Sequence, residues 1–228
     1  MSLELIEQIL KWLREVKDKR KSIEVVSFYN ELPVRTKVSV IDIDPDRKVI
    51  QWSSNPRLSL AAGESKKLYL RFPKSFDDGD LFLGADVIYF NEDLVESTFP
   101  RPVVEPRFRR EHLRVTTSEK LPVIADAKKD GEEGIVSFKV FDISEGGIGV
   151  LVNKGLFKLG EKLDLKLTFP NEREINTKGV VVNVKDLGKV DKVGIKFTSL
   201  SNRDLNVLGR YIMDRQREIM DKIRLLID

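Results

Sequence analysis

The chain has 228 residues, 41% of them hydrophobic, so it can bury one large core or two small ones. Its 40 basic and 37 acidic residues leave a net charge of +3, which excludes a protein that coats nucleic acid over its whole surface, so any anion site must be local. Cysteine is absent and His112 is the single histidine, which excludes disulfides, thiolate zinc sites and histidine acid–base pairs and argues against an enzyme.

The segment 1–22 is predicted to form an amphipathic helix of about four turns. Apolar residues recur in it at helical spacing: Leu5, Ile6, Ile9, Leu10, Leu13 and Val16. The apolar run is too short for a signal peptide or a membrane span, so a soluble cytoplasmic protein is expected. Glu4, Glu7 and Glu15 would repel anionic lipid, so packing on its own domain or on a second subunit is favoured over binding to a membrane surface.

Short alternating or β-branched runs from Ile23 to about Val104 predict a series of strands. The segments between these runs read as turns: LPV at 32–34, DPDRK at 44–48, AAGES at 61–65 and DDGD at 77–80. DPDRK lies between two β-rich runs and is predicted to be a hairpin connection.

A boundary between two domains is predicted at FPRPVVEPRFRR, residues 99–110. Pro100, Pro102 and Pro106 hold the backbone extended and oppose a helix there. The predicted domains are residues 1–104 and 105–228, joined by this hinge rich in proline and arginine.

The second half repeats the strand pattern and then changes to a helical period. Its short strand-like runs have the regular spacing expected of a small barrel or sandwich. The last segment begins at Ser201, a residue suited to the N-cap, and is predicted to be a helix that covers an open barrel end or pairs with a neighbour. The predicted fold class is therefore mainly β, with two small β-barrels or split barrels and a helix at each end of the chain.

Arginines gather directly after the hinge, at Arg107, Arg109, Arg110 and Arg114. Arg110 and Arg114 are four residues apart, so they share a face in an extended segment and in a helical turn alike, and both can reach one ligand. A planar guanidinium fork matches phosphate oxygens and the O6/N7 edge of guanine. Neither Arg110 nor Arg114 is expected to matter to the fold.

A second motif follows in FDISEGGIGV, residues 141–150. Asp142 and Ser144 lie two apart at a strand end and are expected to point the same way, while Gly146 and Gly147 let the backbone turn and approach a flat ligand. An ionised aspartate accepts hydrogen bonds from the N1–H and N2–H of guanine. The glycines run into a strand rather than opening a helix, which argues against nucleotide hydrolysis and Rossmann-type cofactors. Together the two motifs describe a site for a guanine nucleotide with phosphates.

The order R-x-x-x-R at 110–114 and then D-x-S-x-x-G at 142–147, in a small β domain, resembles the PilZ family of cyclic di-GMP (c-di-GMP) receptors. The β-rich first half with its hinge resembles the two-domain flagellar-brake (YcgR-like) branch of that family. The resemblance implies that Arg110 and Arg114 bind guanines and phosphates, that Asp142 and Ser144 bind guanine or phosphate, and that Gly147 is the motif glycine. It also implies that an extra arginine, here Arg109, favours two intercalated ligand molecules per site.

The resemblance implies a bacterial, non-enzymatic receptor whose domain arrangement changes on binding c-di-GMP. Its output would be regulation of a protein partner, a flagellar motor or secretion component, with recruitment to a flagellar basal body; no cofactor, metal or DNA is expected. An alternative is a small-barrel RNA-binding protein that uses Arg107, Arg109, Arg110 and Phe108 for phosphate contact and base stacking. That alternative gives Asp142 no role. The sequence leaves open whether the terminal helices form a homodimer.

Overall fold

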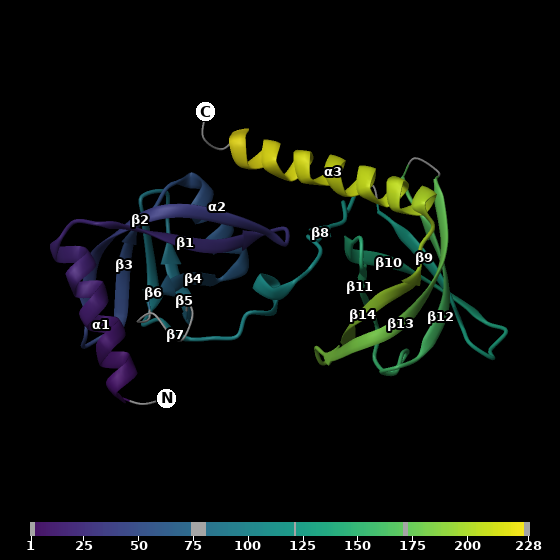
Figure 1. The fold of residues 1–228 in the computed structure, drawn as a ribbon, viewed down its shortest axis with the longest axis horizontal. Helices are drawn as coiled ribbons and strands as arrows, with labels where there is room; N and C mark the ends of the chain where they lie inside the picture. The colour runs from purple at the N-terminus through teal and green to yellow at the C-terminus, as the bar shows by residue number, and fades with distance from the viewer. Residues whose placement is uncertain (1–2, 74–80, 121, 171–172, 226–228) are drawn as a thin grey trace. The chain divides into compact units, whose positions relative to one another are not determined.

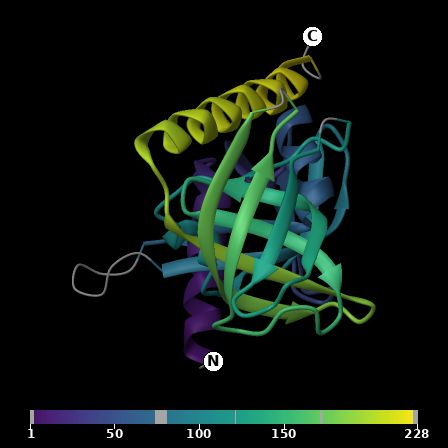
Figure 2. The same cartoon turned by 90° about the vertical axis from the view of Figure 1, so that its right-hand side faces the viewer.

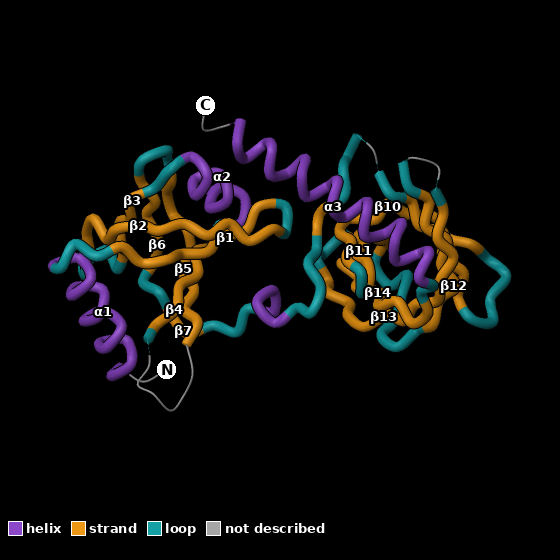
Figure 3. The backbone as a smooth tube through the Cα atoms, turned by 45° about the horizontal axis from the view of Figure 1, so that its top comes forward, coloured by secondary structure: helices purple, strands orange, loops and turns teal. Residues whose placement is uncertain are grey.

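The computed structural model describes residues 3–73, 81–120, 122–170 and 173–225. The chain divides into two compact units, the first running to Arg110 and including the chain from Met220, the second running from Glu111 to Ile219. Each unit is built mainly of strands (Figures 1 and 3), and the described strands pair antiparallel. The predicted fold class, mainly β with two barrels and a helix at each end, is confirmed.

The first unit closes six strands into a barrel. Its strands are β1 (Ser22–Tyr29), β2 (Leu32–Asp44), β3 (Val49–Ser53), β4 (Lys67–Phe72), β5 (Leu81–Phe90), β6 (Leu94–Thr98) and the short β7 (Arg101–Pro102). They pair in the order β4-β1-β2-β3-β6-β5, and β4 pairs with β5 to complete the ring, while β7 adds to β5. Trp52 is fully buried inside and its indole N–H donates to the Ser97 hydroxyl at 2.8 Å, so its polar atom is satisfied within the core.

The N-terminal helix α1 (Leu3–Asp18) packs on this barrel. Ile9, Leu13 and Val16 are buried in the same core as the barrel residues, while the acidic side of the helix is exposed. The prediction that this helix packs on its own domain is therefore confirmed.

A second helix in this unit, α2 (Pro56–Ser65), corrects the prediction that AAGES is a turn. Asn55 caps it by accepting from the backbone N–H of Leu58 at 3.0 Å, and proline occupies the first turn, where its missing N–H has no consequence. Its small residues let the helix lie against the barrel; a Cβ at Gly63 would lie 2.7 Å from the Phe90 ring. The predicted LPV turn is also wrong, because these residues begin β2. DDGD lies outside the described residues.

The DPDRK hairpin is confirmed between β2 and β3. Asp44 accepts from the backbone N–H groups of Asp46 and Arg47 at 3.0 and 2.9 Å, so its side chain stabilises the turn.

The sequence predicts an extended backbone through the proline-rich segment, but part of this segment is helical. Pro106–Arg109 form a 3₁₀ helix, η1, with Pro106 in its first turn and the Glu105 carboxylate accepting from the N–H of Arg107. Proline is compatible with a first helical turn because that N–H has no partner within the helix. At Arg110 the backbone is extended again, with φ −69° and ψ 130°.

The second unit is another closed barrel of six strands (Figure 2). Its elements are β8 (Val115–Thr116), β9 (Ile124–Lys129), β10 (Ile135–Ser144), β11 (Gly147–Asn153), β12 (Lys162–Thr168), β13 (Glu174–Asp186), β14 (Val190–Ser199) and the helix α3 (Asn202–Leu225). The order is β11-β14-β13-β12-β9-β10, closed by pairing of β10 with β11, and β8 adds to β10. This closure brings the hairpin that carries the second motif against β14.

Ser201 is the N-cap of α3, as predicted. Its hydroxyl accepts from the N–H of Asp204 at 3.2 Å, and the Asp204 carboxylate accepts from the N–H of Ser201 at 3.3 Å, which is a reciprocal capping box. Further along, Arg215 is buried and donates to the carbonyl of Thr116 at 2.9 Å, so this part of α3 is joined to β8. Among the described residues, no helix combines the length and apolar character needed to cross a membrane.

Candidate functional site

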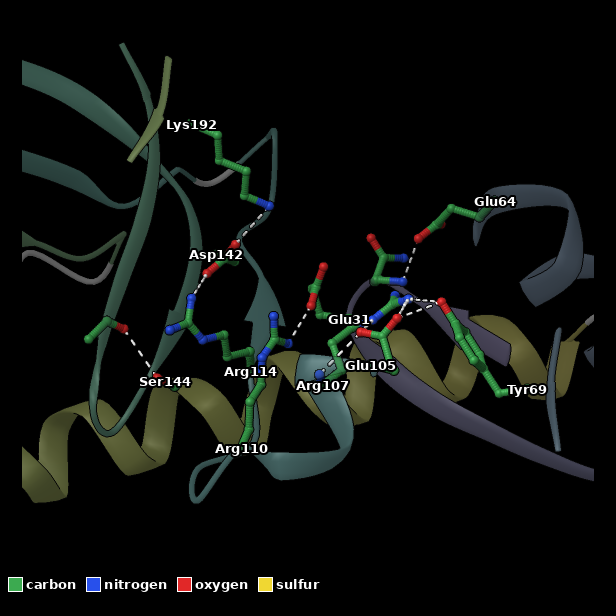
Figure 4. A network of polar contacts seen from close by, with 12 residues as sticks. Glu31, Glu64, Tyr69, Glu105, Arg107, Arg110, Arg114, Asp142, Ser144 and Lys192 are labelled. Atoms are coloured by element: carbon green, nitrogen blue, oxygen red, sulfur yellow. Dashed lines mark hydrogen bonds and ion pairs between the residues drawn. The ribbon is translucent and has the colours of Figure 1, made fainter. Parts of the chain in front are cut away.

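The two arginines of the R-x-x-x-R motif have different carboxylate partners (Figure 4). Arg110, at the end of the first unit, forms an ion pair with Glu31, with Nη1 and Oε2 2.6 Å apart. Arg114, in the second unit, forms an ion pair with Asp142, with Nη1 and Oδ1 2.9 Å apart. The structure therefore brings Arg114 and Asp142 of the two motifs together and places Arg110 on a carboxylate outside both.

Asp142 lies on β10 with its side chain only 1% exposed. Burying an ionised carboxylate is unfavourable unless cations or hydrogen-bond donors compensate its charge. Arg114 supplies one hydrogen bond, and the Nζ of Lys192 on β14 lies 3.4 Å from Oδ2. Oδ2 itself accepts no hydrogen bond from the described residues. The carboxylate is thus held between two cations with one oxygen still able to accept.

Gly149 makes room for this carboxylate. It lies opposite Asp142 in the pairing of β10 with β11, and a Cβ on it would be 2.6 Å from both carboxylate oxygens. Sequence reasoning missed Gly149, although its spacing of two from Gly147 places both on one face of a strand. It also missed Lys192, which lies in a predicted strand but belongs to neither motif.

The other residues predicted for the second motif lie in the β10–β11 hairpin. Ser144 is buried and its hydroxyl donates to the carbonyl of Gly147 at 3.3 Å. Neither Gly146 nor Gly147 has a left-handed φ, so the turn itself does not require glycine at either position. The close approach of β14 does require glycine at position 147, because a Cβ at Gly147 would lie 2.2 Å from the carbonyl oxygen of Ile195.

His112 links the first motif to the second. It lies against Gly146, where a Cβ would be 2.9 Å from its Cδ2, and its Nδ1 is 3.4 Å from a carboxylate oxygen of Glu145. The segment between the motif arginines therefore contacts the β10–β11 turn within the second unit. Arg109, the remaining predicted site residue, ends η1 and is exposed.

Arg107 and Phe108 belong to a separate network in the first unit. Arg107 donates to both oxygens of Glu105 at 2.8 and 3.1 Å and to the Tyr69 hydroxyl at 2.9 Å, and the Tyr69 hydroxyl donates to Glu105 at 2.6 Å (Figure 4). The Arg107 guanidinium lies 3.8 Å from the centre of the Phe28 ring, and Phe108 packs among aromatic rings. These two residues fix η1 to the first barrel. Two of the four side chains that the RNA-binding alternative requires are therefore engaged in contacts within the protein.

The ionisation of Glu105 is coupled to folding. Burial opposes its ionisation, but hydrogen bonds from Arg107 and Tyr69 outweigh burial and lower the pKa of Glu105 from 4.5 to about 2. A carboxyl group with a lowered folded-state pKa contributes stability above its unfolded pKa and loses it as the pH falls toward the folded value. Glu105 therefore stabilises the first unit at neutral pH and ceases to do so between pH 4.5 and about 2.

We expect Glu105→Gln to flatten the acid limb of the stability curve. The free energy of unfolding of the wild type should fall by on the order of 2 kcal/mol more than that of the variant between about pH 7 and pH 2.5. Urea unfolding followed by tryptophan fluorescence, which reports on the first unit through Trp12 and Trp52, measures it. Glu24→Gln is the matched control, because Glu24 pairs with Arg35 while half-exposed and should leave the curve unchanged. Parallel curves for the wild type and Glu105→Gln would contradict the assignment.

Within the described residues, no cluster of three or more histidine, aspartate or glutamate side chains is arranged to hold a metal ion. The polar groups at the two motifs are instead cations beside single carboxylates. Such an arrangement suits an organic anion that also carries hydrogen-bond donors.

The chain is similar to several known proteins. Residues 108–214 match the family model described as the PilZ domain. The chain is 26% identical over 213 residues to an uncharacterized protein of Aquifex aeolicus (strain VF5), covering 87% of this chain and 89% of that protein. It is also 26% identical over 202 residues to the flagellar brake protein YcgR of Azoarcus sp. (strain BH72), covering 82% of this chain and 74% of that one.

Among solved structures, the K. pneumonia MrkH–c-di-GMP complex aligns with 95% of this chain and 96% of its own at a TM-score of 0.50 and 16% identity, which is a likeness of fold. The sequence similarity to YcgR also extends beyond the second barrel, since 82% of the chain cannot be covered without residues of the first unit. Residues 108–214 therefore match the PilZ domain, and the chain is similar over 82% of its length to the flagellar brake protein YcgR of Azoarcus sp..

Proposed function

We propose that this protein is a non-enzymatic receptor for c-di-GMP. The observation that carries the proposal is the buried Asp142, which lies in the D-x-S-x-x-G hairpin and pairs with Arg114 of R-x-x-x-R. The match to the PilZ domain and the fold shared with MrkH, a protein solved in complex with c-di-GMP, support it.

The ligand offers groups that are complementary to each of these side chains. Guanine N1–H and N2–H are donors for Asp142, and the phosphates and the O6/N7 edge are acceptors for Arg110 and Arg114. Binding is then an exchange of partners in which Arg114 turns from Asp142 to the ligand while the base edge takes its place. Lys192, which lies 3.4 Å from Oδ2, stays beside the carboxylate, so its buried charge remains compensated throughout.

The remaining predicted residues complete the site. Ser144 offers a hydroxyl to guanine or phosphate, Gly146 and Gly147 keep the hairpin free of side chains, and the exposed Arg109 is available to a second ligand molecule. We propose two ligand molecules per chain on this ground.

The proposed output is a change in the arrangement of the two domains. Arg110 ends the first unit and Arg114 lies in the second, so a ligand held by both would favour one arrangement over others. Similarity to a flagellar brake protein supports a protein partner in motility, and a secretion component is the other candidate. We further propose that the protein acts in the cytoplasm at a flagellar basal body and that DNA is not among its partners. The proposed boundary between its two functional domains lies at residues 104–105.

Calorimetric titration at two salt concentrations tests the ligand. We expect c-di-GMP to bind saturably, at two molecules per chain, with modest salt dependence, and a short RNA to bind weakly and lose its affinity at the higher salt. Asp142→Asn should weaken c-di-GMP binding by about tenfold or more because it removes an acceptor matched to two donors. Asp164→Asn, an exposed aspartate of the same unit, is the control and should bind as the wild type does. Tighter binding of RNA than of c-di-GMP at both salt concentrations would favour the RNA-binding alternative instead.

A further inference from the structure

We infer that Glu31 sets the affinity of the site by competing with the ligand for Arg110. This inference rests on the proposed function. The Glu31 carboxylate lies 2.6 Å from Nη1 of Arg110, and the two side chains are 16% and 28% exposed. A charge-assisted hydrogen bond of this length, with its carboxylate largely shielded from water, is stronger than a pair between two fully exposed side chains. A ligand phosphate must break it in order to use the same guanidinium.

The backbone holds Glu31 in this position at some cost in free energy. Asn30 and Glu31 form the two-residue turn between β1 and β2, whose last paired residues are Tyr29 and Leu32. Both turn residues have a positive φ, 49° at Asn30 and 68° at Glu31. Such turns favour glycine at the second position, and a glutamate there is strained. A charged side chain at a position that suits glycine indicates that the side chain has a role of its own.

The turn is also fixed from outside. The backbone N–H of Asn30 donates to Oε1 of Glu64 on α2 at 2.6 Å. This contact anchors the hairpin tip to the first unit, so Glu31 meets Arg110 from a supported position. The carboxylate is thus a preorganised partner for this arginine rather than a mobile surface charge.

Glu31 and Asp142 differ in what the ligand can do for them. Asp142 loses Arg114 on binding but gains the guanine donors, so its exchange is balanced. Glu31 loses Arg110 to a phosphate, and a second anion beside it offers no hydrogen bond in return. The carboxylate has to turn into water or remain next to a like charge, and either outcome subtracts from the binding free energy. Glu31 therefore raises the ligand concentration at which the receptor responds.

Glu31→Gln tests this inference. Glutamine keeps the size of the side chain and the turn but removes the charge, so we expect c-di-GMP to bind about three- to tenfold more tightly than to the wild type in calorimetric titration. Glu31→Gly, which relieves the strained φ, should also tighten binding and guards against a folding defect in the first variant. Glu24→Gln makes the same change of net charge on the same hairpin, where Glu24 pairs with Arg35, and should leave the affinity within about twofold of the wild type.

A double-mutant cycle shows whether Glu31 acts through Arg110. In an Arg110→Ala background, Glu31→Gln should no longer change the affinity. Unchanged or weaker binding by Glu31→Gln on the wild-type background would overturn the inference and assign Glu31 a positioning role, while leaving the proposed function intact. If neither the wild type nor Glu31→Gln binds c-di-GMP, the proposed function fails and the inference fails with it.

Discussion

Arg114→Ala is expected to lose most of the c-di-GMP affinity and a measurable part of the stability of the second unit. Loss of one bidentate fork should weaken binding by at least ~1 to 3 kcal/mol. The same change removes the hydrogen bond to a carboxylate that is 1% exposed and leaves it with Lys192 alone, 3.4 Å away. Removing one partner of a buried ion pair leaves a poorly compensated charge, so we expect the free energy of unfolding to fall by about 2 to 3 kcal/mol. This prediction replaces the expectation from the sequence that Arg114 is irrelevant to the fold, because Arg114 is paired with a buried carboxylate.

Two further variants separate binding from stability. Arg110→Ala makes the same change at a pair whose carboxylate is less deeply buried, so it should weaken binding with a smaller loss of stability. Arg114→Ala combined with Asp142→Ala removes both charges and should recover stability without recovering binding. Calorimetric titration measures the affinities, and thermal unfolding by circular dichroism measures the stabilities. An Arg114→Ala protein with the melting temperature and affinity of the wild type would refute both parts of this prediction.

Gly147→Ala is expected to prevent the second barrel from folding normally. The added Cβ would lie 2.2 Å from the carbonyl oxygen of Ile195 and 3.1 Å from the Cα of Lys196. Both atoms belong to the backbone of β14, which is paired with β11 on one side and β13 on the other and cannot move away without breaking one of these pairings. We expect a loss of about 3 kcal/mol or more, comparable with severe overpacking of a core.

Gly134→Ala is the matched control for this prediction. Apart from its two chain neighbours, none of the described residues comes within 4 Å of a Cβ at Gly134, so this variant of the same unit should have the unfolding free energy of the wild type. Urea unfolding and limited proteolysis of the two variants give the comparison. Equal stability of the two proteins would show that β14 can adjust and that the glycine serves the ligand alone. If Gly147→Ala unfolds, loss of binding in that variant cannot be taken as evidence of a ligand contact.

Patterns local in sequence predicted most of the secondary structure. The apolar spacing around Ile9 and Leu13 predicted α1, and Ser201 as N-cap predicted the start of α3, because helical faces and caps depend on residues close in sequence. The helix α2 was missed because its ten residues are rich in serine, alanine and glycine and it is held by packing on the first barrel rather than by its own periodicity. The 3₁₀ turn at Pro106 was missed because proline opposes a helix in its interior but not in its first turn.

The order of the two motifs, read from the sequence alone, predicted the resemblance to the PilZ family and the residue types of the candidate site. Only the tertiary structure decided what each of those residues contacts. Arg110 meets Glu31 across 79 positions of sequence and Arg114 meets Asp142 across 28, while Lys192 and Gly149 reach Asp142 through the pairing of separate strands. Pairing of β11 with both β10 and β14 brings Lys192 to Asp142, and packing of η1 on the first barrel leads the chain to the contact of Arg110 with Glu31. No window of neighbouring residues encodes these two contacts, so the motif predicts the type of ligand while the fold decides which charges compete with that ligand.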